Sequence, residues 1–246
     1  MPRLARQKSE TGFYHILLRG VGRQNIFEDD EDKQRFLETL ERYKKELHFE
    51  LHAYCLMGNH VHLLIKDVSN QLDQIMKKIA GSYAYYFNRK YERVGHLFQD
   101  RFKSEVIQDD SYYLTVLRYI HQNPLKAGLS KMERYPFSSY GEYVGNSTIT
   151  DKDFAVALLG GVNNLIDFLH QEEKSNCLDD VERKTLTDTK AREILSKKYH
   201  IKNFVIVQQL ETKKRNELLR SLKEEGMSIR QIERMTGLNR GVIQRA

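Results

Sequence analysis

Two histidines separated by one residue, His60 and His62, are the side chains of this chain best suited to hold a metal ion. They follow Gly58-Asn59, a dipeptide typical of a two-residue hairpin turn, with apolar β-forming stretches on both sides of it. Residues two apart on a strand point to the same face, so the two imidazoles would lie side by side. Two neutral imidazoles would supply half of a metal site.

Tyr119 and Asn123, further along the chain, are candidates for the other half of the site. Residues 109–111, Asp-Asp-Ser, are typical of a helix start, and no helix breaker follows until Asn123-Pro124. Residues four apart lie on one helix face, one turn from each other. The phenol and the amide could therefore meet the two imidazoles, which predicts a metal site with a tyrosine nucleophile beside it.

These motifs resemble those of the HUH single-tyrosine transposases, in particular the REP-associated tyrosine transposases, which are relatives of insertion-sequence transposases that move single-stranded DNA. The similarity runs in order over about residues 10–140 and is therefore more specific than a short motif. Besides the histidine pair it includes Phe-Tyr-His-Ile-Leu-Leu-Arg-Gly at 13–20, Asn-Ile-Phe at 25–27, the strand segment 95–104, and Tyr-Ile-His-Gln-Asn-Pro-Leu-Lys-Ala-Gly-Leu at 119–129.

The resemblance departs from many insertion-sequence members at the third metal ligand. Those members carry glutamine four residues after the tyrosine, whereas this chain has Asn123, as the REP-associated group tends to. The neighbouring Gln122 would project about 100° away on the helix. Imidazoles with an amide oxygen, and open positions for phosphate oxygens, suit Mg²⁺ or Mn²⁺. We therefore expect His60, His62 and Asn123 to hold one of these ions.

The resemblance implies that Tyr119 is the catalytic residue of a metal-dependent single-stranded DNA endonuclease and strand transferase. Its attack on phosphorus would give a 5′-phosphotyrosine link and a free 3′-hydroxyl that can rejoin strands. A tyrosine has an ordinary pKa of about 10, so it needs help to lose its proton, and the sequence does not identify the base. We expect single-stranded or hairpin DNA as the partner of a monomer or homodimer.

The predicted elements alternate between strands and helices in a way that indicates an α+β fold. Strands or hairpins are expected at 13–20, 50–66 and about 101–108, and helices at 31–47, 70–91 and 112–122. This order predicts a ferredoxin-like antiparallel sheet with helices on one face, and the resemblance implies the same fold. The expected domains are a nuclease domain over 1–140, a helical connector and linker over 141–189, and a small all-α unit over 190–246.

The end of the chain has the pattern of a helix-turn-helix. Ser228 could cap a helix with apolar residues at 229, 232 and 235, Gly237 suits a tight turn, and Asn239 could cap a second helix. Basic residues elsewhere could follow a DNA backbone, although scattered charges are often only a solvated surface. The predicted DNA-binding residues are Arg3, Arg6, Arg19, Arg23, Arg101, Arg240, Gln244 and Arg245.

The bulk composition is compatible with this interpretation. Forty Lys and Arg against thirty-four Asp and Glu give a formal charge of +6 and a pI near 9.1, which fits a polyanionic partner. The two cysteines lack metal-type spacing and indicate a reducing cytoplasm. The basic start has no apolar segment of a secretory signal, and the best apolar run, 154–162, is too short to span a membrane. We expect a cytoplasmic protein without a membrane partner.

Two other interpretations remain open at this stage. A His-x-His pair on a strand is often just two partly buried polar residues, and a lone tyrosine on an apolar helix is usually part of a core. The chain could therefore be a DNA-binding or regulatory protein that keeps the fold and does not cut. It could also be a metal hydrolase in which Tyr119 only orients the substrate.

Overall fold

A four-stranded antiparallel sheet in the order β2-β3-β1-β4 forms the frame of the N-terminal part of the chain. The strands are β1 (Phe13–Arg19), β2 (Glu50–Met57), β3 (His60–Lys66) and β4 (Lys103–Val106). A two-residue turn joins β2 to β3, so that Met57 pairs with His60, as the dipeptide Gly58-Asn59 predicts. The predicted antiparallel α+β fold, with its ferredoxin-like strand order, is confirmed.

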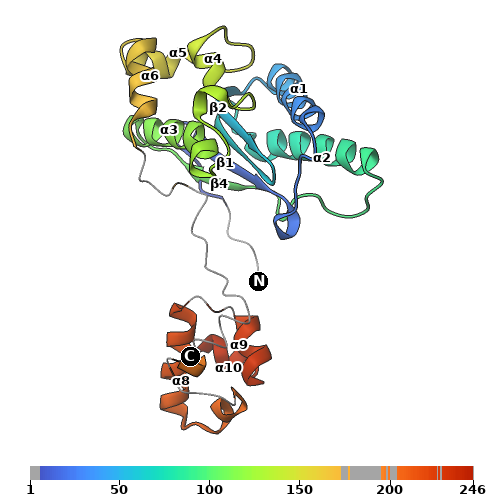
Figure 1. Cartoon of the computed structure of the whole chain (residues 1–246), viewed down its shortest axis with the longest axis vertical. Helices are drawn as coiled ribbons and strands as arrows, with labels where there is room; N and C mark the ends of the chain where they lie inside the picture. Colours follow the sequence, from blue (N-terminus) through green and yellow to red (C-terminus); the bar gives the residue numbers. More distant parts are fainter. Residues whose placement is uncertain are drawn as a thin grey trace. The chain divides into compact units, whose positions relative to one another are not determined.

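The protein is described here from a computed structural model, whose described residues are 6–172, 177, 195–197, 199, 204–225, 227 and 229–245. The chain forms two compact units, Met1–Asp179 and Asp180–Ala246 (Figure 1), and each is treated by itself. In the described residues no helix combines the length and the apolar character needed to cross a bilayer.

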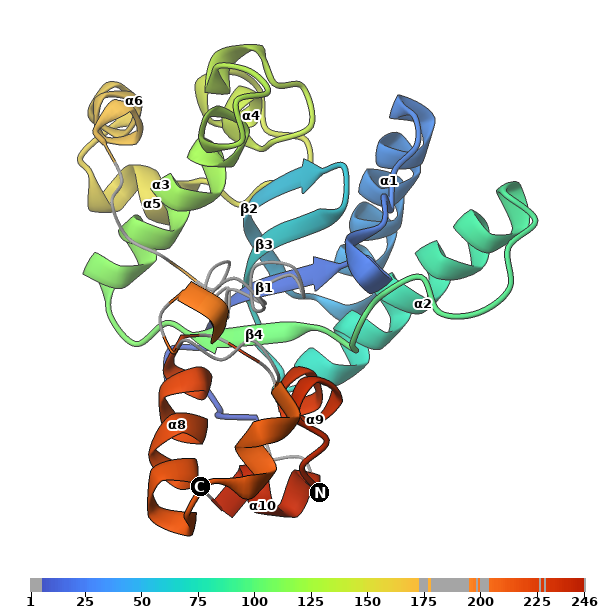
Figure 2. The same cartoon turned by 60° about the horizontal axis from the view of Figure 1, so that its bottom comes forward.

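Helices cover both faces of the sheet, in contrast to the expected arrangement with helices on one face. The helices α1 (Asp30–Leu47) and α2 (Leu72–Lys90) bury their apolar sides against Ile16 and Leu63, which point to one face. Helix α3 (Asp110–Lys126) packs against the other face, which includes Phe13 and Leu64 (Figure 2). The reason is that β1 and β3 are buried on both faces, so each face needs a cover.

Three short helices, α4 (Tyr140–Val144), α5 (Asp153–Leu158) and α6 (Val162–His170), belong to the same compact unit as the sheet. The expected helical connector and linker over 141–189 includes nearly all of this segment. Instead, Leu165 and Leu169 of α6 are fully buried in the apolar cluster that contains α3. Helix α3 is apolar nearly all round, so the side turned away from the sheet also needs a cover.

All regular secondary structure among the described residues of the second unit is helical. It contains the 3₁₀ segment η3 (Phe204–Gln209) and the helices α8 (Thr212–Glu224), α9 (Ile229–Thr236) and α10 (Arg240–Arg245). Gly237 has the predicted positive φ of 70°, and Oδ1 of Asn239 accepts the backbone N–H of Gly241 at 2.8 Å, the predicted cap of α10. Ser228, the other predicted cap, lies outside the described residues.

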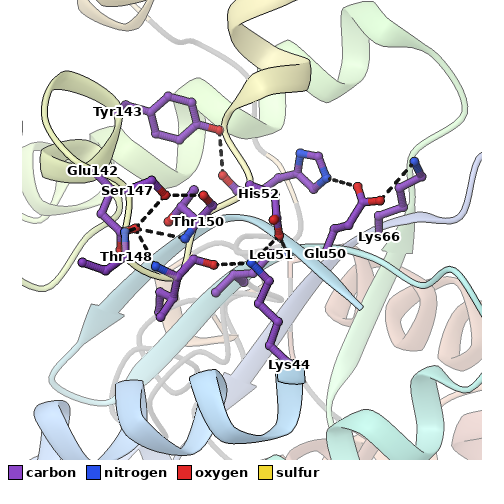
Figure 3. A network of polar contacts seen from close by, with 12 residues as sticks. Lys44, Glu50, Leu51, His52, Lys66, Glu142, Tyr143, Ser147, Thr148 and Thr150 are labelled. Atoms are coloured by element: carbon purple, nitrogen blue, oxygen red, sulfur yellow. Dashed lines mark hydrogen bonds and ion pairs between the residues drawn. The ribbon is translucent and has the colours of Figure 1, made fainter. Parts of the chain in front are cut away.

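A buried carboxylate fixes the chain between α4 and α5 to the edge of the sheet (Figure 3). Oε2 of Glu142 accepts the backbone N–H groups of residues 148–150 at 2.6–2.9 Å, and Oε1 accepts the hydroxyl of Tyr54 at 2.9 Å. Lys44 of α1 bridges the same segment through an ion pair with Asp151 at 2.6 Å. Burial alone would raise the pKa of Glu142, but these hydrogen bonds outweigh it and lower the pKa below its ordinary value of 4.5.

We predict that Glu142→Gln destabilises the first unit by about 1–3 kcal/mol at neutral pH, because buried N–H groups lose a charged acceptor. The depressed pKa means that this stabilisation is complete above pH 4.5 and is lost as the pH falls through the folded-state pKa. Calorimetric unfolding from pH 7 to pH 3 measures both effects. The control is Glu41→Gln, which removes an exposed ion pair with Lys45. It should change the free energy of unfolding by no more than about 0.5 kcal/mol. Equal melting temperatures of Glu142→Gln and wild type at pH 7 would contradict the prediction.

Candidate active site

The two histidines of β3 lie on the sheet face that α3 covers. His62 is fully buried and pairs across the sheet with Leu17 on β1 and Cys55 on β2. His60, at the first position of the strand, is half-buried and pairs with Arg19 and Met57. The two rings are neighbours, with centroids 5.0 Å apart and planes at 90°. This is the side-by-side arrangement that the spacing predicts.

Each of the two imidazoles is oriented through its Nδ1 atom. Nδ1 of His60 lies 2.6 Å from Oδ1 of Asn59, and Nδ1 of His62 lies 2.9 Å from Nε2 of His15. A ring whose Nδ1–H is donated to a neighbour coordinates a metal through Nε2. His60 meets this condition because the amide oxygen of Asn59 can only accept, whereas for His62 it depends on which ring donates in the contact with His15.

Helix α3 brings Tyr119 against these rings. The ring centroid of Tyr119 lies 5.7 Å from that of His62 and 5.9 Å from that of His15, with edge-to-face geometry in both pairs. The helix starts at Asp109, whose Oδ1 accepts the N–H of Tyr112 at 2.7 Å. Its apolar residues pack against the strands and set its rotation, so that the nearly buried Tyr119 faces the histidines.

Asn123 lies one turn after Tyr119 and is also buried. Its Nδ2 donates to the carbonyl of Tyr119 at 3.0 Å, which makes its amide oxygen the atom suited to a cation. The Nε2 atom of Gln122 instead donates to the carbonyls of Leu169 and Gln171, at 2.8 and 2.6 Å. The amide of Gln122 is thus directed towards the end of α6, which favours Asn123 as the third ligand.

The imidazole nitrogens and the amide oxygen suit a divalent ion that accepts both nitrogen and oxygen ligands. Among the described residues, no three His, Cys, Asp or Glu side chains are grouped so that they could hold a metal ion. A site at His60 and His62 therefore needs oxygen from an amide, a substrate or water as well. Two imidazoles with such oxygens suit Mn²⁺, and also Mg²⁺ where the substrate supplies oxygens.

Three charged or polar side chains near the site were not assigned to it from the sequence. The Nζ atom of Lys126 lies 4.5 Å from the ring centroid of Tyr119, and its position seven residues later is a same-face spacing that could have identified it. His15 lies in the segment 13–20, and no local pattern of that segment indicates its contact with His62. Glu105 of β4 pairs with His15 across the sheet, a neighbour that depends on strand register.

Two further buried histidines have other roles. Nδ1 of His52 bonds to the hydroxyl of Tyr113 at 2.9 Å, and burial lowers the pKa of this histidine. Nε2 of His121 bonds to the hydroxyl of Ser139 at 2.7 Å, and burial lowers its pKa to about 3. Both hold α3 and its surroundings together as neutral hydrogen-bonding groups.

The predicted DNA-binding residues of the first unit lie in different places. Arg19 is on the same sheet face as the histidines and directly beside His60 in the strand pairing. Arg23 is exposed, in the segment after β1, with a φ of 64°. Arg6 forms an ion pair with Asp73 at the start of α2, and its guanidinium lies 3.6 Å from the ring centroid of Phe102. Arg101 is exposed just before β4, and Arg3 lies outside the described residues.

The predicted DNA-binding residues of the second unit lie on α10. Arg240, Gln244 and Arg245 are all exposed. The Nε atom of Arg240 is 2.5 Å from Oε2 of Glu233, which ties α10 to α9. The exposed side chains give α10 a polar outer face, while Ile243 packs into the core of the unit.

Comparison with known proteins shows what this chain is similar to. Residues 8–123 match the model of a family described as IS200-like transposases, so this stretch of the chain is similar to that family. Its relatives include a Haemophilus influenzae protein named as a REP-associated tyrosine transposase, which is 28% identical over 124 residues. That match covers 45% of this chain and 68% of the relative.

A solved structure supports the fold. It is that of a REP-associated tyrosine transposase bound to a REP hairpin, and it superposes with a TM-score of 0.50 at 18% identity. The match covers 62% of this chain and 96% of the solved chain. The fold of the first unit is therefore that of a transposase of this kind.

We predict that His60→Ala and His62→Ala each weaken Mn²⁺ binding to the full-length protein by more than about 100-fold. Loss of an outer-shell partner already lowers metal affinity about 10–100-fold in typical sites, and loss of a ligand lowers it further. Asn123→Ala should also weaken binding, whereas Gln122→Ala, its neighbour on the other side of the helix, should not. Titration calorimetry measures each affinity. A larger loss at Gln122→Ala than at Asn123→Ala would assign the third ligand to Gln122.

Proposed function

We propose that this protein is a transposase that acts as a metal-dependent endonuclease and strand transferase for single-stranded DNA, with Tyr119 as its nucleophile. The observation that carries the proposal is the edge-to-face contact between the Tyr119 ring and the His62 ring, whose centroids are 5.7 Å apart. A tyrosine on the helix thus lies against the buried member of the histidine pair on the strand. The resemblance to HUH transposases supplies the reaction class.

The metal would be held by the imidazoles of His60 and His62 and by the amide oxygen of Asn123. When bound, a divalent ion supplies charge that polarises the scissile phosphate and offsets the negative charge of the transition state. The chain contributes rings already oriented by Asn59 and His15. Preorganised ligands of this kind need no rearrangement when substrate arrives.

Tyr119 would carry out the chemical step. Its phenolic oxygen forms a bond to phosphorus, the bond between phosphorus and the 3′-oxygen breaks, and the departing oxygen takes up a proton as a 3′-hydroxyl. The product is a 5′-phosphotyrosine, and a 3′-hydroxyl of the same or another strand can reverse the step. The ammonium of Lys126, 4.5 Å from the ring centroid, places positive charge beside the phenol as it loses its proton.

The DNA partner we propose is a hairpin with a single-stranded flank. The solved relative is a complex with a REP hairpin. In this chain Arg19 lies beside the histidine pair, where it can meet a phosphate, and α10 offers Arg240 and Arg245 at the surface of the second unit. The chemistry and part of the DNA affinity would then belong to different units of the chain.

We predict that Tyr119→Phe forms no covalent adduct with a single-stranded hairpin oligonucleotide in the presence of Mn²⁺. The change removes only the hydroxyl, so metal affinity should stay within about twofold. The control is Tyr113→Phe, a buried tyrosine of the same helix nearly two turns earlier, which should keep the adduct. Denaturing gels and mass spectrometry of the trapped peptide give the readout.

The same experiment separates the alternatives. Cleavage without an adduct in the wild type would mean that Tyr119 only orients substrate in a metal hydrolase. Binding without cleavage over a panel of hairpins and metals would mean a regulatory DNA-binding protein. A nucleotide mass on a tyrosine other than Tyr119 would contradict the assigned nucleophile.

We predict that the double variant Arg240→Ala/Arg245→Ala weakens hairpin binding and lowers the slope of log affinity against log salt by roughly one to two. Cleavage at saturating DNA should be unchanged, since the proposed chemistry lies in the first unit. The control Lys213→Ala/Lys214→Ala removes the same charge from exposed positions of α8. If both double variants lost the same DNA affinity, the loss would reflect total charge alone. That result would argue against α10 as the part that contacts DNA.

A further inference from the structure

His15 of β1 links the proposed metal ligand His62 to a carboxylate. It is fully buried, and its Nε2 lies 2.9 Å from Nδ1 of His62. Its Nδ1 lies 3.8 Å from Oε2 of Glu105 on β4, whose side chain is about a third exposed. Three side chains from three neighbouring strands therefore form a row, from the partly exposed Glu105 inward to His62.

The direction of the hydrogen bond between the two histidines determines which nitrogen of His62 can bind a metal. A neutral imidazole has one N–H donor and one acceptor nitrogen, and the bond needs one of each. The carboxylate of Glu105 beside Nδ1 of His15 favours a proton on that nitrogen, which makes Nε2 of His15 the acceptor. His62 then donates from Nδ1, and the lone pair of its Nε2 is directed to the metal.

We propose that His15 is a positioning residue that fixes the tautomer and ring orientation of His62 for metal binding, with Glu105 fixing the tautomer of His15. This inference rests on the proposed function, because it assumes that His62 is a ligand. The proposed function alone requires only the metal ligands, and this inference adds a requirement for His15. The metal site depends on a strand of the sheet that supplies no ligand.

His60 provides an internal comparison, because its Nδ1 is held by a different kind of partner. The amide oxygen of Asn59 accepts there, and an amide oxygen can only accept, so the tautomer of His60 needs no further support. An imidazole partner such as His15 can donate or accept and has to be fixed itself. This difference gives Glu105 a role at His62 that has no counterpart at His60.

The experiment measures Mn²⁺ affinity of the full-length protein by titration calorimetry for wild type, His15→Met and His15→Gln. Methionine fills the site without an acceptor of comparable strength, and affinity should fall about 10–100-fold. The Gln side chain can present its amide oxygen near the position of Nε2, so His15→Gln should recover most of the affinity. Glu105→Ala should cause a smaller loss than His15→Met, because it acts one step further from the metal.

His52→Met is the matched control. His52 is likewise buried on the α3 side of the sheet, next to a glutamate and an aromatic residue, but its partner is Tyr113 instead of His62. Its substitution should cost stability without changing Mn²⁺ affinity. This control separates a positioning role from the general cost of replacing a buried histidine.

A second readout does not need the variants to fold well. Long-range ¹H–¹⁵N spectra of the metal-free wild type should show His62 as the Nδ1–H tautomer. The opposite tautomer, or an affinity of folded His15→Met equal to that of the wild type, would overturn the proposal. If the wild type itself binds no Mn²⁺, or binds it equally after His62→Ala, the proposed function fails instead, so the two failures are distinguishable.

Discussion

The register of β3 between its two neighbours is the constraint on which the candidate site depends. Side chains alternate along a strand, so a shift by one residue would turn His60 and His62 to the face of α1 and α2. The register is held because Val61, Leu63 and Ile65 are fully buried on that opposite face. Fully burying one such side chain stabilises a fold by about 1.5–3 kcal/mol, so a slip would lose several such contributions at once.

The rotation of α3 is the second requirement, and it follows from the same alternation. The face opposite Val61 presents small or apolar side chains at Ala53, Cys55 and Leu64, and α3 packs its apolar residues on them. Tyr119 then lies beside the histidines instead of in the centre of this contact. The same apolar packing that holds α3 on the sheet therefore also positions the polar residues of the candidate site.

Local patterns in the sequence predict those parts of the site that lie within one element. The turn Gly58-Asn59, the same-face histidine pair and the four-residue spacing of Tyr119 and Asn123 are of this kind, and the structure contains each arrangement. The proximity of α3 to β3 could be expected only from the family resemblance. The roles of these residues remain proposals that the experiments above test.

What could not be predicted depends on contacts between distant segments. The neighbours of His15 follow from the register of β1 against β3 and β4, which no single segment encodes. The ion pair between Arg6 and Asp73 likewise joins residues far apart in the chain, so no local pattern predicts it. Helices cover both faces of the sheet because β3 is apolar on both faces and α3 is apolar nearly all round. Which helix covers which face is decided only when the layers pack together.

The hydrogen bond between His15 and His62 also explains how two imidazoles can be buried side by side. One nitrogen must accept for the bond to exist, so the two rings cannot both be cations while it is formed. A pair with at most one charge costs far less to bury than two adjacent cations. When both rings are neutral and His62 is the donor, the lone pair of its Nε2 is left for a metal. The neutral, hydrogen-bonded pair therefore suits both burial in the core and metal binding at His62.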